Sequence, residues 1–332
     1  MHDRSPGSNN LAKISRRRAN DLQPYPAAHY ERPDPMLSPA LGSRLSIAAL
    51  VLALASAGTA AAQGPVAWKL TKGDKLTYQF IQKNDIKVTV NGQDIKNVTT
   101  LDVELAWEVQ EVAADGKATV GQTIQHARVE LTTPNGPVVY DSKKKAEDPA
   151  TQQIAKIYDN VIGEKYILVL TPAGEVTSVT VPEKVAAAVK GSPFEALADS
   201  GSLLSSKGVQ KMMAQVLPKL SEKATAKGAT WNGSLELPAG PIQMTLDTAY
   251  TLSSLEGAKA EIDGKIDTKI AAGPGSPLTV KVNKQTGDSK FKLDGGKLVS
   301  STIKQVFDMT LGVNNQEIAQ VINIDAAMTL KP

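Results

Sequence analysis

The stretch IQMTLDTAYTLSSLEGAKAEIDGKIDTKI, residues 242–270, decides the fold of this chain. From 242 to 252, every second side chain is apolar, aromatic or threonine, and mostly polar residues fill the positions between them. The alternation resumes from 260 to 270, after a turn at Leu255-Glu256-Gly257. A period of two over this length is typical of antiparallel strands with one buried face and one solvent face. We therefore expect long strand ribbons to organise the chain.

Comparable alternation fills much of residues 63–181 and 229–332. Turn signals separate the apolar runs, and Asn91-Gly92 is the clearest hairpin signal among them. A further turn is expected at Gln285-Thr286-Gly287-Asp288, because its residue types favour turns. These patterns predict a mainly β fold, with two curved antiparallel sheets or partial barrels and a helical middle segment.

The two β regions share a layout that suggests a weak duplication. Each begins with a tryptophan near a strand, Trp68 in the first and Trp231 in the second. Each also contains a strand–glycine turn–strand unit, LVLTPAGEVTSV at 168–179 and SKFKLDGGKLVS at 289–300. The units match in residue type but hardly in identity, so the duplication is a hypothesis.

Residues 182–228 are expected to form the helical segment between the β regions. They are rich in Ala, Lys and Ser, and Pro182 and Pro193 are typical of helix starts. An amphipathic stripe follows, made by Val209, Met212, Met213, Val216, Leu217 and Leu220. Its ordinary role is to cover a core; the functional alternative is a mobile apolar lid, since Met suits adaptable surfaces. Another helix is expected in the first β region, capped by Asp148 and started by Pro149.

The N-terminal part has the pattern of an export signal. Within residues 36–62, Arg44 precedes an apolar run, and Ala60-Ala61-Ala62 fits a cleavage site before Gln63. This is the order of a secretory signal peptide, and the alternative is a retained membrane anchor. Residues 1–35 are then either a disordered extension or upstream of the true start at Met36. We expect export to the bacterial periplasm or the extracellular space, with no membrane anchor after cleavage.

Charge and cysteine content exclude several function classes. Residues 1–62 hold seven of the 37 Lys and Arg and four of the 34 Asp and Glu, so residues 63–332 are balanced in charge. Without a positive excess, nucleic acid is not an expected partner. The chain contains no cysteine, which excludes disulfides, thiolate metal sites and a cysteine nucleophile.

Several segments together resemble a known family. They are GDKLTYQF at 73–80, EVAADGKATV at 111–120, VVYDS at 138–142, YILVLTPAGEV at 166–176, VLPK at 216–219, and SKFKLDGGKLVSS at 289–301. In this order the chain resembles a family of exported bacterial proteins defined only as a domain of unknown function. The resemblance spans nearly all of 66–331 and implies a β-rich, secreted or periplasmic protein. It implies no activity, cofactor or catalytic residue.

No group of residues predicts a reaction. His126 is the only histidine after residue 62, and with Arg128 and Glu130 it is expected on an exposed strand face without an orienting partner. Acid pairs such as Asp263 and Asp267 are expected on solvent faces, without an aromatic sugar platform nearby. The sequence lacks the nucleophile elbow, the phosphate loop and the dinucleotide fingerprint. We therefore expect no catalytic, cofactor or metal site.

Two hypotheses about function remain. The first is a non-enzymatic exported envelope protein with a structural or interaction role, whose partner is an unknown envelope component. The alternative is a periplasmic carrier or binding module for an apolar, lipid-like ligand. The residues expected to line the carrier's cavity are Met212, Met213, Leu246, Tyr250, Ile262 and Ile266. A cavity lined by them favours the carrier, and a filled core favours the structural role.

Overall fold

The computed structural model describes residues 65–133, 136–190, 195, 203–239, 242–273, 275–313 and 316–332. They belong to one compact unit, Thr59–Pro332, which is described by itself. The expected signal segment and the expected helix start at Pro193 lie outside the described residues.

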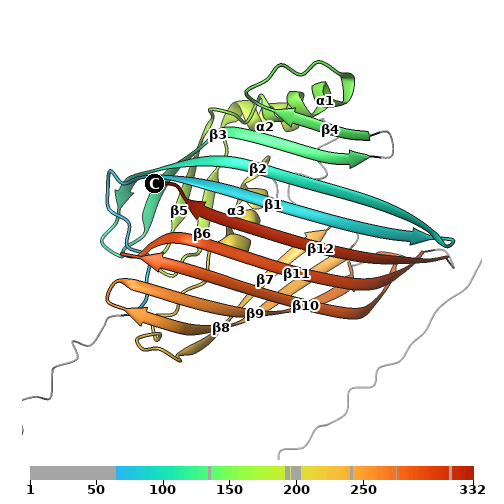
Figure 1. Ribbon diagram of the computed structural model, residues 1–332. Helices are drawn as coiled ribbons and strands as arrows, with labels where there is room; N and C mark the ends of the chain where they lie inside the picture. The colour runs from blue at the N-terminus through green and yellow to red at the C-terminus, as the bar shows by residue number, and fades with distance from the viewer. Residues whose placement is uncertain are drawn as a thin grey trace, which may run out of the picture. The chain divides into compact units, whose positions relative to one another are not determined.

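One antiparallel sheet of twelve strands makes up most of the described chain (Figure 1). The strand order is β6-β5-β3-β2-β1-β12-β11-β10-β9-β8-β7, and β4 pairs with β3 beside this path. The strands are β1 Lys75–Val90, β2 Gln93–Val112, β3 Ala118–Thr133, β4 Gly136–Asp141, β5 Lys165–Leu170, β6 Val176–Thr180, β7 Thr230–Ala239, β8 Ile242–Glu256, β9 Lys259–Ala272, β10 Thr279–Asp294, β11 Lys297–Val313 and β12 Gln316–Leu330.

The mainly β prediction is confirmed, but the two expected sheets are joined into one. The junction is the antiparallel pair β1–β12, whose register runs from Tyr78 opposite Leu330 to Thr89 opposite Ala319. Each β region would otherwise present a long edge strand with unpaired backbone groups. Pairing the first strand with the last removes both edges at once.

The predicted turn at 285–288 is wrong. Strand β10 continues through these residues, with a register shift between Val282 and Lys284. Its glycine, Gly287, is needed for close approach rather than for a turn. A Cβ placed there would lie 2.8 Å from Ile266 Cβ on β9.

Three helices accompany the sheet in the described residues: α1 Pro149–Tyr158, α2 Glu183–Val189 and α3 Ser206–Val216. As expected, Asp148 caps α1, and its side chain accepts a hydrogen bond of 2.9 Å from the Thr151 amide. Helix α2 begins directly after Pro182. None of the described helices is both long and apolar enough to cross a membrane.

Helix α3 lies against the inner face of the sheet, behind β1 and β12 in Figure 1. It contacts β6 and β7, the first and last strands in the sheet order, as well as β11 and β12. Its apolar stripe, including Val209, Met212 and Met213, is buried. A helix can contact both ends of one sheet only if the sheet curls around it, so the curled sheet encloses an interior.

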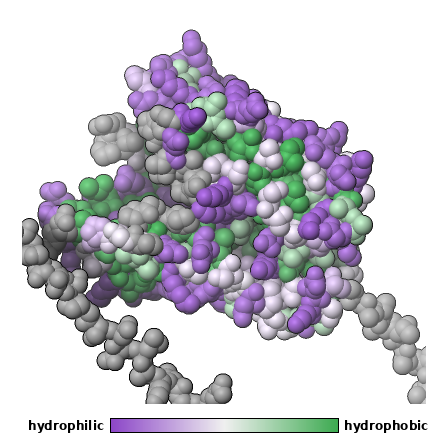
Figure 2. All heavy atoms as spheres, turned by 180° about the vertical axis from the view of Figure 1, so that it is seen from behind, coloured by the Kyte–Doolittle hydropathy of each residue, from purple (hydrophilic) through white to green (hydrophobic). Residues whose placement is uncertain are grey.

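The main core fills one end of this interior and ties the two β regions together. Tyr78 on β1 packs edge-on against Trp107, with ring centroids 5.1 Å apart. Its hydroxyl donates a 3.2 Å hydrogen bond to the carbonyl of Leu298 on β11. Trp107 in turn donates a 2.8 Å hydrogen bond to the buried side chain of Gln122. The rear face of the molecule also shows apolar residues between hydrophilic margins (Figure 2).

Candidate functional site

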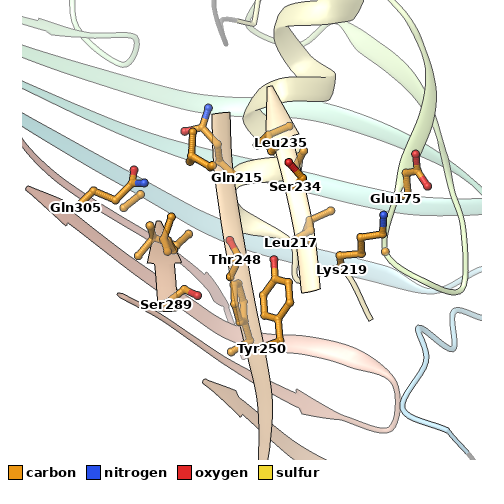
Figure 3. A pocket seen from close by; sticks show the side chains of 18 of the residues that line it. Glu175, Gln215, Leu217, Lys219, Ser234, Leu235, Thr248, Tyr250, Ser289 and Gln305 are labelled. Atoms are coloured by element: carbon orange, nitrogen blue, oxygen red, sulfur yellow. The ribbon is translucent and has the colours of Figure 1, made fainter. Parts of the chain in front are cut away.

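A cavity of about 160 Å³ lies inside the curled sheet, beside the C-terminal end of α3 (Figure 3). Strands β7 to β12 supply most of its wall, and the rest comes from the end of α3, the residues that follow it, and the turn between β5 and β6. Its apolar lining residues are Leu217, Leu235, Leu246, Tyr250, Ile266, Phe291, Ile303, Ile324 and Ala326. An apolar cavity of about 150 Å³ in a protein interior is large enough to bind benzene. The cavity therefore has room for one small apolar group.

Glycines and one aromatic ring shape the cavity's floor. Tyr250 stacks on Trp231 with ring centroids 5.5 Å apart, and it lies 6.2 Å from the Phe291 ring. The Tyr250 ring passes close to two glycines, since a Cβ on Gly233 would lie 3.0 Å from it and a Cβ on Gly264 3.4 Å. Burial raises the pKa of the Tyr250 phenol, so this wall stays uncharged at neutral pH.

The segment after α3 fixes the opposite wall. Trp231 on β7 donates a 2.6 Å hydrogen bond to the Lys219 carbonyl, and the Leu220 amide donates a 2.7 Å hydrogen bond to the Ala173 carbonyl. Ala173 belongs to the turn between β5 and β6. The segment is therefore bonded to both ends of the sheet, and it holds Leu217 over the cavity.

Two buried polar atoms in the wall have no hydrogen-bond partner. They are Ser289 Oγ on β10 and Gln305 Nε2 on β11, in residues only 3% and 5% exposed. A buried polar group without a partner typically costs about 1–3 kcal/mol, so folded proteins contain few of them. Ser289 lies opposite Ile303, two residues before Gln305, so the two side chains are diagonal neighbours on the same face.

A gap in the sheet lies next to the cavity. Strands β9 and β10 pair only from Lys259 with Asp294 to Lys265 with Asp288, and their backbones form no further pairs beyond this point. The side chain of Gln285 bridges the gap, where its Oε1 accepts a 2.8 Å hydrogen bond from the Thr268 amide and its Nε2 donates to Asp267. A side chain thus replaces one of the missing backbone hydrogen bonds between the strands.

A larger hollow of about 830 Å³ lies at this gap. It shares lining residues with the inner cavity, namely Lys219, Gly233, Ser234, Thr248 and Ile266. Its other lining residues are mostly polar and include Asp247, Asp267 and Asp288. The apolar cavity therefore borders a wide polar hollow, which provides a route to solvent.

The charges around the hollow are largely neutralised. Lys269 Nζ lies 2.7 Å from Asp247 and lowers the pKa of that carboxyl, and Ser234 donates a 2.7 Å hydrogen bond to it. Lys265 pairs with Asp288. Lys219 has no ion-pair partner among the described residues, and its stem lies 3.7 Å from where a Cβ on Gly233 would be.

The structure brings only half of the predicted lining residues together at the cavity. Leu246, Tyr250 and Ile266 line it, as the sequence predicts. Met212 and Met213 are instead buried in the main core, at 4% and 0% exposure, and do not line the cavity; neither does Ile262, buried at 1%. Their apolar periodicity correctly shows that they are buried, but not which surface covers them.

Ser289 and Gln305 were missed in the sequence, although a signal was present. Both are polar residues at inward positions of apolar strands, since Ser289 alternates with Phe291, and Gln305 lies between Ile303 and Phe307. An inward polar residue breaks the pattern of a strand with one buried face. Such breaks are the places where a buried polar site is expected.

The polar group around His126 is arranged differently from the expectation. His126 is 16% exposed in its side chain and has a partner, since its Nε2 lies 2.9 Å from Asp141 on β4. The contact with His126 lowers the pKa of the Asp141 carboxyl. Arg128 and Glu130 do share a face and form an ion pair. In the described part of the chain, no three His, Cys, Asp or Glu residues gather as metal ligands.

Fold and cavity together define a class of protein, a curled antiparallel sheet around one helix with a small internal cavity. The sequence profile of a family of unknown function (DUF6263) matches residues 115–297, more than half of the chain. The chain belongs to this family, and the predicted resemblance to a domain of unknown function is confirmed. A search of curated proteins gave no match.

Comparisons with solved structures give only distant similarity. A structure described as lipid–protein interactions in lipovitellin shares 12% identity with a TM-score of 0.45, over 79% of this chain and 25% of that one. This chain thus spans a quarter of the lipovitellin chain. DynF from the dynemicin biosynthesis pathway of Micromonospora chersina shares 8% identity with a TM-score of 0.20, over 81% and 86% of the two chains. The Pseudomonas aeruginosa protein OccK5 (OpdH) gives 6% and 0.23, over 78% and 99%. Similarities this weak do not bear on function.

Proposed function

We propose that this protein is a non-enzymatic, exported binding protein that holds a small apolar or amphipathic molecule inside its curled sheet. The observation that supports the proposal is the apolar cavity of about 160 Å³, with Ser289 Oγ and Gln305 Nε2 unpartnered in its wall. Ligand sites are typically concave and mostly apolar, with a few polar groups that fix orientation. A filled core would have favoured the structural or interaction role.

The bordering hollow supports the same proposal, because a binding site needs a route for its ligand. Ile266 and Thr248 line both spaces, and the hollow lies where the pairing of β9 with β10 ends. The cavity alone is smaller than a site for a drug-sized ligand, which typically has about 300–1,000 Å³. The inner cavity therefore fits one end of a molecule, and the hollow fits the rest.

The test fills the cavity and measures binding. Ala326 on β12 lines the cavity, so Ala326→Phe is expected to occupy it. The neighbouring Ala327 is directed to the opposite face of the strand, because successive side chains alternate, and Ala327→Phe is the matched control. Toluene binding is measured by ligand-observed NMR on delipidated protein. Native mass spectrometry of protein from its own host identifies any co-purified molecule.

We expect toluene to bind saturably to the natural protein and to the Ala327→Phe variant, and at least tenfold more weakly to Ala326→Phe. Equal binding by both variants would place the ligand elsewhere. No saturable binding, together with no co-purified molecule, would leave the structural or interaction role as the better hypothesis.

A further inference from the structure

We infer that the ligand carries an uncharged, hydrogen-bonding oxygen on its buried apolar end, and that Ser289 and Gln305 recognise this oxygen. This inference rests on the proposed function and adds the chemical class of the ligand. It starts from the two buried polar atoms that the folded chain leaves without a partner, on two residues that line the cavity.

The burial of Ser289 follows from the glycine opposite it. Ser289 on β10 pairs with Gly264 on β9, and a Cβ on Gly264 would lie 2.2 Å from Ser289 Oγ. The hydroxyl therefore occupies the space that a β-strand side chain would otherwise take, next to Tyr250 on β8. Serine and glycine together place an oxygen in the wall where a larger pair would fill the cavity.

Gln305 presents its amide from the neighbouring strand. Its cross-strand partners are Gly287 on β10 and Ile324 on β12, and neither offers a polar side chain. Figure 3 shows Gln305 and Ser289 on the same side of the site. An amide Nε2 only donates hydrogen bonds, and a serine hydroxyl both donates and accepts. A ligand oxygen that accepts from both atoms would satisfy them together.

The distribution of charge indicates that the oxygen is uncharged. The charged residues that line the cavity are Glu175 and Lys219, both exposed. Figure 3 shows these two near each other, away from Ser289 and Gln305. A carboxylate bound at the buried pair would have no cation beside it, and a buried unpaired charge is far more costly than a neutral polar group. Alcohols, phenols and ketones therefore fit the site better than acids.

The experiment compares toluene and phenol, which match in size, with benzoate, which is somewhat larger and carries a negative charge. Each probe is titrated into delipidated full-length protein and followed by isothermal calorimetry and ligand-observed NMR. We expect phenol to bind about fivefold to tenfold more tightly than toluene, and benzoate to bind more weakly than phenol. The variants are Ser289→Ala and Gln305→Leu, and the control is Ser300→Ala on β11, which lies outside the cavity lining.

Each variant should reduce the preference for phenol over toluene to about twofold or less, measured as the ratio of the two affinities in the same variant. The control should keep the preference. Ser289→Ala removes a buried hydroxyl that has no partner, so the variant should be at least as stable as the natural protein in urea denaturation. Gln305→Leu tests the same inference independently. Binding of toluene and phenol with equal affinity would overturn the inference and leave the proposed function intact. Benzoate binding as tightly as phenol would also overturn it. Failure of all three probes to bind would overturn both.

Discussion

The substitution Gly264→Ala tests the geometry of the cavity wall through stability alone. The new methyl carbon would lie 2.2 Å from Ser289 Oγ, 3.0 Å from Thr248 Cγ2 and 3.4 Å from Tyr250 Cδ1. Ordinary contacts begin near 3.4 Å, so the serine oxygen must move by roughly 1 Å or the strands must separate. Overpacking of this kind costs about 1–3 kcal/mol. Removing a mid-strand glycine recovers about 0.5–1 kcal/mol of that cost.

We therefore expect Gly264→Ala to lower the free energy of unfolding by about 1–2 kcal/mol. Ser289→Ala alone should raise it, by up to about 1–3 kcal/mol, because the variant removes a buried hydroxyl that has no partner. In the double variant the worst contact is absent, so most of the loss should be recovered. Urea denaturation of the four proteins gives the coupling energy, which we expect to be about 1 kcal/mol.

Gly121→Ala on β3 is the matched control for this cycle. A Cβ at Gly121 would meet Gln110 Nε2 at 3.0 Å and the Lys165 Cδ at 3.2 Å, and both belong to flexible side chains that can move aside. Its effect should stay within about 0.5 kcal/mol. Additive effects of Gly264→Ala and Ser289→Ala would refute the placement of the serine hydroxyl over Gly264.

Three further predictions follow from the described contacts and from the sequence. Ile266→Lys places a charge on the cavity wall and should lower the free energy of unfolding by about 2 kcal/mol or more. Lys265→Ile, on a side chain that is 82% exposed, should change it by no more than about 0.5 kcal/mol. Equal urea midpoints for the two variants would show that the inward face is misassigned. The hydrogen bond from Lys297 lowers the pKa of Asp74 below its ordinary 3.8. The stabilisation that the ionised Asp74 gives the folded state is therefore present above pH 3.8 and is lost as the pH falls through the lower folded pKa. In urea titrations, the loss of stability caused by Asp74→Asn should be constant near neutral pH and should shrink below about pH 4. Finally, N-terminal sequencing of protein from its native host should begin after Ala62, and an intact 45–62 segment in the mature protein would contradict export by cleavage.

The local structure could be predicted from the sequence because it depends on neighbouring residues. Alternation predicted β8 and β9, and the Asn91-Gly92 signal marks a turn whose residues have φ of 50° and 77°. The single sheet could not be predicted this way. The β1–β12 pair joins residues more than two hundred positions apart, and alternation shows which face of a strand is buried but not which strand lies beside it.

The candidate site was predicted in part for the same reason. Leu246, Tyr250 and Ile266 line the cavity, and the alternation in their own strands predicts that they face inward. Met213 lies in the main core instead, because an apolar helical stripe packs equally well on a filled core. Gln285 and Gly287 belong to a segment whose residue types favour a turn, yet both lie in strand β10. There Gln285 bridges the gap to β9, and Gly287 makes room for Ile266. Local propensity is overridden there by tertiary contacts.

The residues that break the simple strand pattern lie close together at the cavity wall, and this favours a bound ligand over trapped water. Gly264 and Gly287 remove side chains from the wall, while Ser289 and Gln305 add polar atoms without partners. A cavity of about 160 Å³ has room for about five water molecules at their liquid volume of about 30 Å³ each. Each buried water needs two to four polar partners, and the Leu, Ile, Phe and Tyr side chains that supply much of the wall offer few of them. A molecule with one oxygen and an apolar body satisfies both buried atoms and fills the rest of the space, which water does not.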